Sequence, residues 1–309
     1  MGGALFWNSA IATRLHLRHV IDKHSQTLQR AYLPPIGDSA SDPSPAHEFL
    51  SMFDLTDVAF KSDGKKPKTL LEGITVSFPT GAFSAIVGHN GSGKSTLIKL
   101  LARKNKPASG AIALDGQDLA NHGTRDFARK VAYLPQNPVV PPHLSVRELV
   151  AFGRYPWRGA FGRYRDEDHA KIDQAMELTH VTGFSDRLVA SLSGGERQRV
   201  WLAMLLAQDA PVLLLDEPTS ALDVGHQRDI LQLVANLKDQ NNLTVIAVLH
   251  DIDMVGRFAD HILALRGGKT CWQGTPRDFM HGETLRDIFQ TDIDVIHLAD
   301  HDRFVSYVA

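Results

Sequence analysis

The sequence has little cysteine and no long apolar run, and each absence excludes a class of protein. Cys271 is the only cysteine among 309 residues, so an internal disulfide is excluded and a reducing compartment is favoured. The best apolar run, Val200 to Ala207, is far shorter than the roughly 20 residues that a membrane-spanning helix needs. If the protein serves a membrane process, another chain must cross the bilayer.

An excess of one charge is lacking too, as is an internal repeat. The formal net charge is -2 at pH 7 and the isoelectric point is about 6.7, which argues against nucleic acid or an anionic membrane surface as a broad partner. The fractions of hydrophobic and charged residues, 43% and 22%, are those of an ordinary globular protein. The length allows one large domain or two small ones.

The first fifty residues differ from the rest of the chain. Residues 1–32 carry four Lys or Arg against one acid, and residues 33–45 have the Pro, Ser and Asp content typical of a disordered linker. A targeting peptide is one interpretation; an unstructured extension, or a start of translation near Met52, is the one we favour. We expect a folded domain over residues 51–275 and a short C-terminal tail over 276–309.

Apolar patterning predicts an α/β fold. Residues 53–60 and 74–78 alternate apolar and polar side chains, as half-buried antiparallel strands do. Four other runs are almost continuously apolar, as in strands buried on both faces: residues 82–87, 130–134, 212–215 and 245–249. Helical periodicity lies between them, for example over 170–178 and 230–237. We therefore expect a parallel sheet covered by helices, an N-terminal antiparallel β-subdomain and a helical insert over about 137–192.

A complete phosphate-loop pattern follows the first buried strand. Its residues are Gly88, His89, Asn90, Gly91, Ser92, Gly93, Lys94, Ser95 and Thr96. Glycines let the backbone curl so that its N–H groups point at phosphate oxygens. We expect Lys94 to reach the β- and γ-phosphates of ATP, Ser95 to ligate Mg²⁺, and Thr96 to start a helix whose positive end faces the same anion. A chance Gly/Ser turn is the competing interpretation, which the strand–loop–helix context disfavours.

Polar residues follow the other buried strands at the same relative position. Asp216 and Glu217 follow one strand, Gln136 another and His250 a third. Each alone is more often an ordinary turn residue, but parallel strands bind ligands at their shared carboxyl edge. We expect one crevice there, with Asp216 on Mg²⁺ and Glu217 as the general base for the attacking water.

A second anion cradle is predicted at Leu192-Ser193-Gly194-Gly195-Glu196. Ser193 and Glu196 have the spacing of a capping box that opens a helix over 197–207. The glycines between them leave backbone N–H groups bare at a helix N-terminus. This motif could close on its own nucleotide or on that of a neighbouring copy.

Together these motifs resemble the ATP-binding cassette (ABC) ATPases. The resemblance spans about residues 53–274 and includes the phosphate loop, Gln136, Leu192–Glu196, Leu213–Pro218, Ser220–Asp223 and His250. It implies two copies packed head to tail, with ATP between the phosphate loop of one and Ser193, Gly194, Gly195 and Glu196 of the other. It also implies that Gln136 senses Mg²⁺ and couples to a membrane subunit, that His250 holds the γ-phosphate, and that Asp223 links the two sites.

A narrower resemblance concerns the substrate. Gly153–Trp157 and Arg129–Gln136 are similar to segments of ATPases that serve importers of iron-siderophore, haem and cobalamin, above all ferric hydroxamate. This implies a homodimer on the cytoplasmic face of the inner membrane, an integral-membrane permease and, indirectly, a substrate-binding protein. Residues 155–157 have a second interpretation, as an aromatic turn that packs the core of the insert, and the two interpretations are compatible. The alternatives are haem or cobalamin import, a non-transport cassette ATPase, or a nucleotide-binding scaffold.

The sequence departs from the family where adenine should stack. Ser62 occupies the place of the usual aromatic residue, so nearby Phe60 is the candidate. His297 and His301 have a metal-like spacing, but the chain has 15 histidines, and we do not expect them to ligate a metal.

Overall fold

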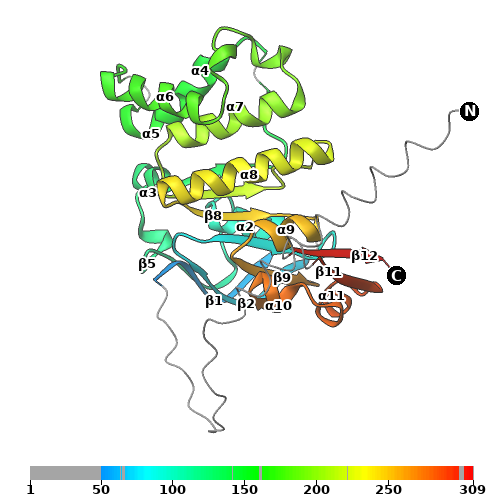
Figure 1. The fold of residues 1–309 in the computed structure, drawn as a ribbon. Coiled ribbons are helices and arrows are strands. Elements are labelled where there is room, and N and C mark those ends of the chain that lie inside the picture. Colours follow the sequence, from blue (N-terminus) through cyan, green and yellow to red (C-terminus); the bar gives the residue numbers. More distant parts are fainter. Residues whose placement is uncertain are drawn as a thin grey trace, which may run out of the picture. The chain divides into compact units, whose positions relative to one another are not determined.

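The computed structural model describes residues 50–62, 64, 67–140, 142–159, 162–220, 222–298 and 303–308. Nearly all of the predicted N-terminal extension, residues 1–49, lies outside these ranges, as does His301. The described residues form the α/β architecture that the sequence predicts, with a mixed sheet, an antiparallel sheet and a helical layer (Figure 1).

The central sheet holds six strands in the order β10-β9-β3-β8-β7-β6. The strands are β3 (Phe83–Val87), β6 (Val131–Leu134), β7 (Val212–Asp216), β8 (Thr244–Val248), β9 (His261–Arg266) and β10 (Lys269–Gly274). All neighbours are parallel except β9 and β10. The four runs predicted as buried strands are thus confirmed as β3, β6, β7 and β8, whereas β9 and β10 were not predicted.

A four-stranded antiparallel sheet in the order β2-β1-β4-β5 forms the N-terminal β-subdomain. It consists of β1 (Ser51–Lys61), β2 (Thr69–Pro79), β4 (Ser109–Leu114) and β5 (Gln117–Asp118). The two alternating segments seen in the sequence are β1 and β2. The sequence pattern misses β4 because only Ile112 and Leu114 of its six residues are buried.

The described helices before the C-terminal segment fall into two groups. Those beside the central sheet are α2 (Lys94–Leu101), α3 (Thr124–Lys130), α8 (Val224–Asn241) and α9 (Ile252–Phe258). The helical layer, at the top of Figure 1, contains α4 (Val146–Ala151), α5 (Tyr155–Arg158), α6 (Asp166–Leu178) and α7 (Gly194–Ala207). Short 3₁₀ turns are η1 (Leu119–Asn121), η2 (Phe152–Arg154), η3 (Thr182–Phe184) and η4 (Val189–Ser191). Because α7 packs on α4 and α6, the helical layer extends beyond the 137–192 insert expected from the sequence.

The C-terminal segment is folded onto the core. It contains α10 (Pro276–Phe279), α11 (Gly282–Phe289) and a hairpin of β11 (Ile293–Leu298) and β12 (Arg303–Val308). Phe279 and Leu285 are fully buried in the main hydrophobic cluster. The part that the sequence presents only as a short tail therefore belongs to the folded body.

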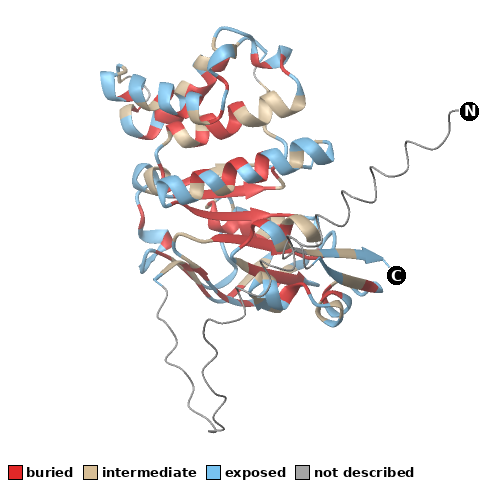
Figure 2. Cartoon of the chain, in the orientation of Figure 1, coloured by how far each residue is buried: buried red, intermediate tan, exposed pale blue. Residues whose placement is uncertain are grey.

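Two hydrophobic clusters lie on the two faces of the central sheet, as the buried strands in Figure 2 indicate. Leu213 and Leu215 of β7 belong to one cluster, whereas Val212 and Leu214 belong to the other. Successive side chains of a strand point to opposite faces, so a strand buried on both sides is almost continuously apolar, with Ser84 of β3 as a buried exception. The first polar side chains after each strand are therefore held at one firmly packed edge.

Candidate nucleotide site

Strand register brings the predicted site residues to a common edge. Asp216, the last residue of β7, pairs with Val248 of β8, and Val248 pairs with Ile86 of β3. The residues just past these positions are Glu217, His250 and the phosphate loop. The convergence that the sequence predicts is therefore present in the backbone itself.

Two glycines of the phosphate loop occupy positions that no other residue fits. At Gly88, with φ of +136°, an added Cβ would lie 2.1 Å from the carbonyl oxygen of Leu265. At Gly93, with φ of +107°, it would lie 2.5 Å from Cδ2 of Leu71. Gly91 also has a positive φ, +78°, but has open space around it. The loop is thus clamped at both ends, while its tip, including His89 and Asn90, is exposed.

Lys94 holds the loop closed around its ammonium group. Its Nζ donates to the carbonyl oxygens of Gly88 (2.8 Å) and His89 (2.9 Å). Burial lowers the pKa of Lys94, although the carboxylates of Glu217 and Asp216 favour its charged form. A cation held at the mouth of a curled loop is an arrangement suited to phosphate.

Ser95 and Asp216 form the part of the site that fits a divalent cation. Ser95 Oγ donates to Asp216 Oδ1 at 3.0 Å. The other oxygen, Oδ2, is buried and has no hydrogen-bond partner among the described residues. Burial raises the pKa of Asp216. A buried carboxylate oxygen without a donor, beside a hydroxyl, is a donor set that suits Mg²⁺, since this ion prefers oxygen ligands.

Glu217 is held between two other predicted residues. Its Oε1 lies 2.7 Å from His250 Nε2, and its Oε2 accepts a hydrogen bond from Gln136 Nε2 at 2.6 Å. The backbone of Glu217 has a φ of +52°, which is uncommon for a residue with a side chain and recurs at functional sites. The polar residues that follow β6, β7 and β8 therefore meet on one carboxylate.

The second cradle has the predicted capping box. Ser193 is the N-cap of α7, its Oγ accepts from Glu196 N at 3.3 Å, and Glu196 Oε2 accepts from Ser193 N at 2.7 Å. That backbone hydrogen bond lowers the pKa of Glu196. Ser193 is exposed, and no hydrogen bond or ion pair between described residues joins positions 193–196 to the phosphate loop. The second cradle is therefore not joined to the chain's own phosphate loop.

Asp223 lies at the N-terminus of α8. Its carboxylate accepts from His226 N at 2.9 Å and lies 2.8 Å from His226 Nδ1. A Cβ on Gly195 would lie 2.9 Å from Cδ2 of the same histidine. Asp223 is thus next to the second cradle, on the exposed side of the chain.

Phe60 lies on β1, which pairs with β2, the strand that borders the phosphate loop. It pairs in register with Leu71, the residue that limits Gly93, and is partly buried against the second cluster. Its stacking on adenine stays a prediction.

Tyr133 is a site residue that the sequence pattern did not predict. Its buried hydroxyl lies close to the Asp216 carboxylate without meeting hydrogen-bond geometry. Burial and that carboxylate raise the pKa of Tyr133 to about 12. The available signal was its place near the end of β6, the strand that leads to Gln136.

The aromatic segment 153–157 is anchored by a buried ion pair. Arg154 Nε donates to Asp168 Oδ1 at 2.8 Å, and both side chains are almost fully buried. Trp157 Nε1 donates to the carbonyl oxygen of Gln208 at 2.6 Å, whereas Tyr155 is exposed. Arg154 thus anchors the segment within the helical layer, but Trp157 is also 38% exposed, so the two aromatic rings do not fill the core of that layer.

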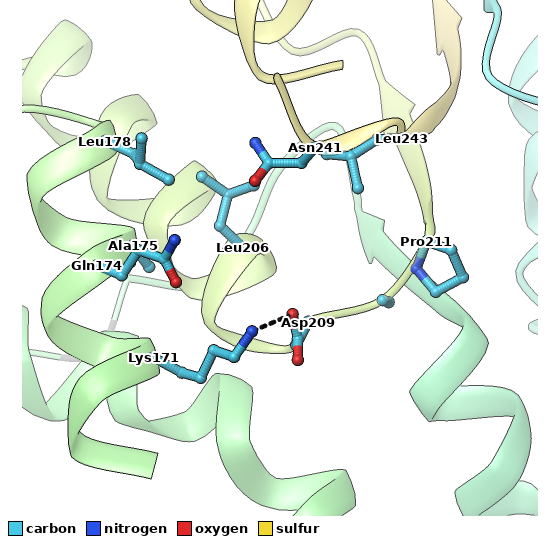
Figure 3. A pocket seen from close by; sticks show the side chains of 10 residues that line it. Lys171, Gln174, Ala175, Leu178, Leu206, Asp209, Pro211, Asn241 and Leu243 are labelled. Carbon is cyan, nitrogen blue, oxygen red and sulfur yellow. Dashed lines mark hydrogen bonds and ion pairs between the residues drawn. The ribbon is translucent and has the colours of Figure 1, made fainter. Parts of the chain in front are cut away.

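A cavity of about 310 Å³ lies apart from this site (Figure 3). It opens between α6, the turn after α7 and the end of α8, where Lys171 pairs with Asp209 at 2.9 Å. None of its lining residues belongs to the predicted site.

In the part of the chain that the structure describes, no helix combines the length and the apolar composition of a membrane span.

A phosphate loop, a carboxylate pair and a second cradle on one α/β scaffold define a cassette-type ATPase. Residues 71–220 match the ABC transporter family. The chain is 44% identical to the ferric enterobactin transport ATP-binding protein FepC of Escherichia coli, over 72% of this chain and 82% of that protein. It is 40% identical to the iron(3+)-hydroxamate import ATP-binding protein FhuC of Bacillus subtilis, over 75% and 87%.

A solved structure gives the same result. The dimeric structure of MJ0796, a bacterial ABC transporter cassette, matches with a TM-score of 0.65 and 27% identity, over 73% of this chain and 99% of that one. The chain belongs to the ATP-binding subunits of ABC transporters, which bind and hydrolyse ATP.

Proposed function

We propose that this chain is the ATPase subunit of an importer that takes up an iron-siderophore-type substrate. It acts as a homodimer on the cytoplasmic face of the inner membrane, bound to an integral-membrane permease that receives its substrate from a binding protein. Support for the substrate class comes from the ferric enterobactin and iron(3+)-hydroxamate relatives. Haem or cobalamin is the competing cargo.

One observation carries the catalytic assignment: both oxygens of Glu217 are held, one by Gln136 and one by His250. A carboxylate fixed at the carboxyl edge of the sheet, beside the phosphate loop, is placed to accept a proton from water that attacks the γ-phosphate. The His250 imidazole, released from Glu217, is the group on hand to hold the γ-phosphate.

The remaining residues bind and position the nucleotide. Residues 88–96 cradle the phosphates through backbone N–H groups, and Lys94 exchanges its two carbonyl partners for phosphate oxygens. Ser95, Asp216 and Gln136 would hold Mg²⁺, which when bound neutralises charge on the phosphates. Ser193, Gly194, Gly195 and Glu196 of the partner copy complete the site, with Asp223 of each copy at the interface.

Replacing the base tests this function. In Glu217→Gln, ATP still binds but hydrolysis falls by roughly 10²- to 10⁴-fold, because the amide cannot accept the proton. Glu177→Gln, the same chemical change on the exposed end of α6, leaves hydrolysis unchanged. Turnover of Glu217→Gln at the wild-type rate would remove Glu217 from this role.

Cargo is tested by uptake. Deleting the gene abolishes import of a radiolabelled ferric siderophore, and the wild-type gene restores it while Glu217→Gln does not. A permease should co-purify with the tagged protein from detergent extract. Unchanged siderophore uptake together with lost haem or cobalamin uptake would assign the other cargo, and a soluble partner alone would favour a non-transport ATPase.

A further inference from the structure

The C-terminal helix α11 touches the phosphate loop. The ring of Phe289, its last residue, packs against the ring of His89 with centroids 5.9 Å apart and planes at 72°, an edge-to-face arrangement. Such a pair is attractive because the positive edge of one ring faces the electron-rich face of the other. A residue far along the sequence therefore contacts the tip of the loop.

His89 is the residue through which this contact can act on the loop. Its carbonyl oxygen accepts hydrogen bonds from Lys94 Nζ at 2.9 Å and from Ser92 N at 3.1 Å. These two bonds set the curl of the loop and the position of its cation. By limiting the positions that the His89 ring can take, the contact restrains the residue whose backbone carries both bonds.

Phe289 is itself firmly anchored. Its ring lies 6.4 Å from that of Phe279, which is fully buried and lies 5.6 Å from Trp272. Arg266 at the end of β9 donates to the carbonyl oxygen of Asp287, in the last turn of α11, at 2.6 Å. The aromatic cluster and this bond fix α11 on the central sheet.

Strand β9 and the turn that follows it also hold the phosphate loop. In the turn between β9 and β10, Gly268 N donates to the carbonyl oxygen of Ser92 at 3.1 Å. Leu265 O is the atom that leaves no room for a Cβ at Gly88. The loop is thus braced by β9, by the β9–β10 turn and by α11.

We propose that Phe289 is a positioning residue for ATP binding, which holds His89 so that the phosphate loop is preformed around Lys94. The inference rests on the proposed function, in that residues 88–96 are taken to bind ATP. A preformed loop costs less conformational entropy when the nucleotide arrives. Loss of the ring contact therefore weakens ATP binding while the groups that carry out hydrolysis stay in place.

The test compares three substitutions at Phe289. Phe289→Leu keeps apolar volume against Phe279 but loses the aromatic edge, and it raises both the Kd of a fluorescent ATP analogue and the KM for ATP by about three- to tenfold, with kcat within twofold of wild type. Phe289→Ala raises the Kd and the KM by at least as much. Phe289→Tyr keeps the aromatic ring and therefore binds ATP with wild-type affinity.

Phe53→Leu is the matched control. It makes the same Phe-to-Leu change at a fully buried residue of β1, in the other hydrophobic cluster, with no ring contact to Phe289 or His89 among the described residues. It therefore lowers the thermal midpoint but leaves the Kd for ATP unchanged. A double-mutant cycle completes the set: in a His89→Ala background, Phe289→Leu has no further effect on ATP affinity.

The outcomes separate this inference from the function on which it rests. If wild-type protein fails to bind ATP in the same assay, the proposed function is wrong. If wild-type protein binds ATP and Phe289→Leu binds it equally well, or if Phe53→Leu weakens binding as much as Phe289→Leu does, Phe289 has no positioning role. The positioning role is equally excluded if the effects of His89→Ala and Phe289→Leu simply add.

Discussion

Gly88 and Gly91 belong to the same loop and both have a positive φ, yet their surroundings differ. A side chain at Gly88 meets the Leu265 carbonyl, whereas one at Gly91 meets nothing within 4 Å. At the scale of single residues, the phosphate-loop pattern thus contains positions required by sterics and positions required only by backbone conformation.

We expect Gly91→Ala to lower the free energy of unfolding by about 1–2 kcal/mol, the cost of a left-handed residue with a side chain. Gly88→Ala adds a backbone clash to a comparable conformational cost, so it lowers stability by more and abolishes ATP binding. Urea unfolding and nucleotide titration of both variants measure this difference. Equal losses of stability at the two positions would contradict the steric account.

His261 predicts a pH dependence of stability. Burial lowers the pKa of His261, whose Nδ1 is buried without a partner among the described residues and whose ring packs edge-on against Phe78. Below the ordinary histidine pKa of about 6.5, the unfolded chain binds a proton at His261, whereas the folded chain stays neutral there down to a lower pH. The contribution to stability is therefore complete above that pH and is lost as pH falls toward the lowered value.

His261→Phe removes this titration while keeping an aromatic ring beside Phe78. We expect its free energy of unfolding to fall less than that of wild type between pH 7.5 and pH 5. Urea unfolding at the two pH values measures the difference. An unchanged pH slope in the variant would show that the folded and unfolded chains bind a proton at His261 equally readily, which would contradict the lowered pKa.

At the scale of elements, Arg154 and Asp168 tie the helical layer together. Arg154 follows α4, Asp168 lies in the first turn of α6, and Arg154 Nη1 also donates to the carbonyl oxygen of Ala207 at the end of α7. Although burial opposes it, hydrogen bonds from Arg165 N and Arg154 lower the pKa of Asp168. The charged pair is therefore the stable form.

Removing one partner leaves a buried charge without compensation. We expect Asp168→Ala or Arg154→Ala to destabilise the protein by about 3–5 kcal/mol, and the double variant Arg154→Met/Asp168→Leu to recover most of that loss. Thermal unfolding of the four proteins measures it. If the double variant were as unstable as the sum of the single ones, the pair would not act as a unit.

Burial also decides which elements could be predicted from the sequence. Strands β3, β6, β7 and β8 were predictable because burial on both faces demands almost continuously apolar residues. The β11–β12 hairpin was not, because its exposed positions include Ile296 and Tyr307, so no alternation marks it.

The nucleotide site, too, has features that could be predicted from the sequence and features that could not. Strand ends predicted that Gln136, Glu217 and His250 converge, since parallel strands share an edge. They could not predict that both oxygens of Glu217 would be taken, or that Tyr133 would lie close to Asp216, because these depend on side-chain conformations. The contact between Phe289 and His89 depends on where the C-terminal segment packs, and no local pattern encodes that.

At the scale of the whole molecule, each proposed nucleotide site needs two copies of the chain. One copy provides the phosphate loop and the other provides the second cradle. Ser193 is exposed, Gly194 and Gly195 are half-buried, and Asp223 is followed by Val224 with 71% of its surface exposed. Exposed backbone donors at a helix N-terminus, beside an exposed apolar residue, suit a surface that is covered in another state. Two copies arranged head to tail cover both surfaces at once.

This arrangement predicts nucleotide-dependent dimerisation. When hydrolysis is blocked by Glu217→Gln, Mg-ATP bridges the phosphate loop of one copy and the second cradle of the other, so light scattering with size exclusion finds a dimer with ATP and a monomer without it. Adding Gly194→Glu places a carboxylate against the incoming phosphate but leaves the phosphate loop intact. That double variant therefore binds ATP as a monomer. A Glu217→Gln protein that remains monomeric in saturating Mg-ATP would mean that the nucleotide is not shared, and the cradle at Ser193 would then need another ligand.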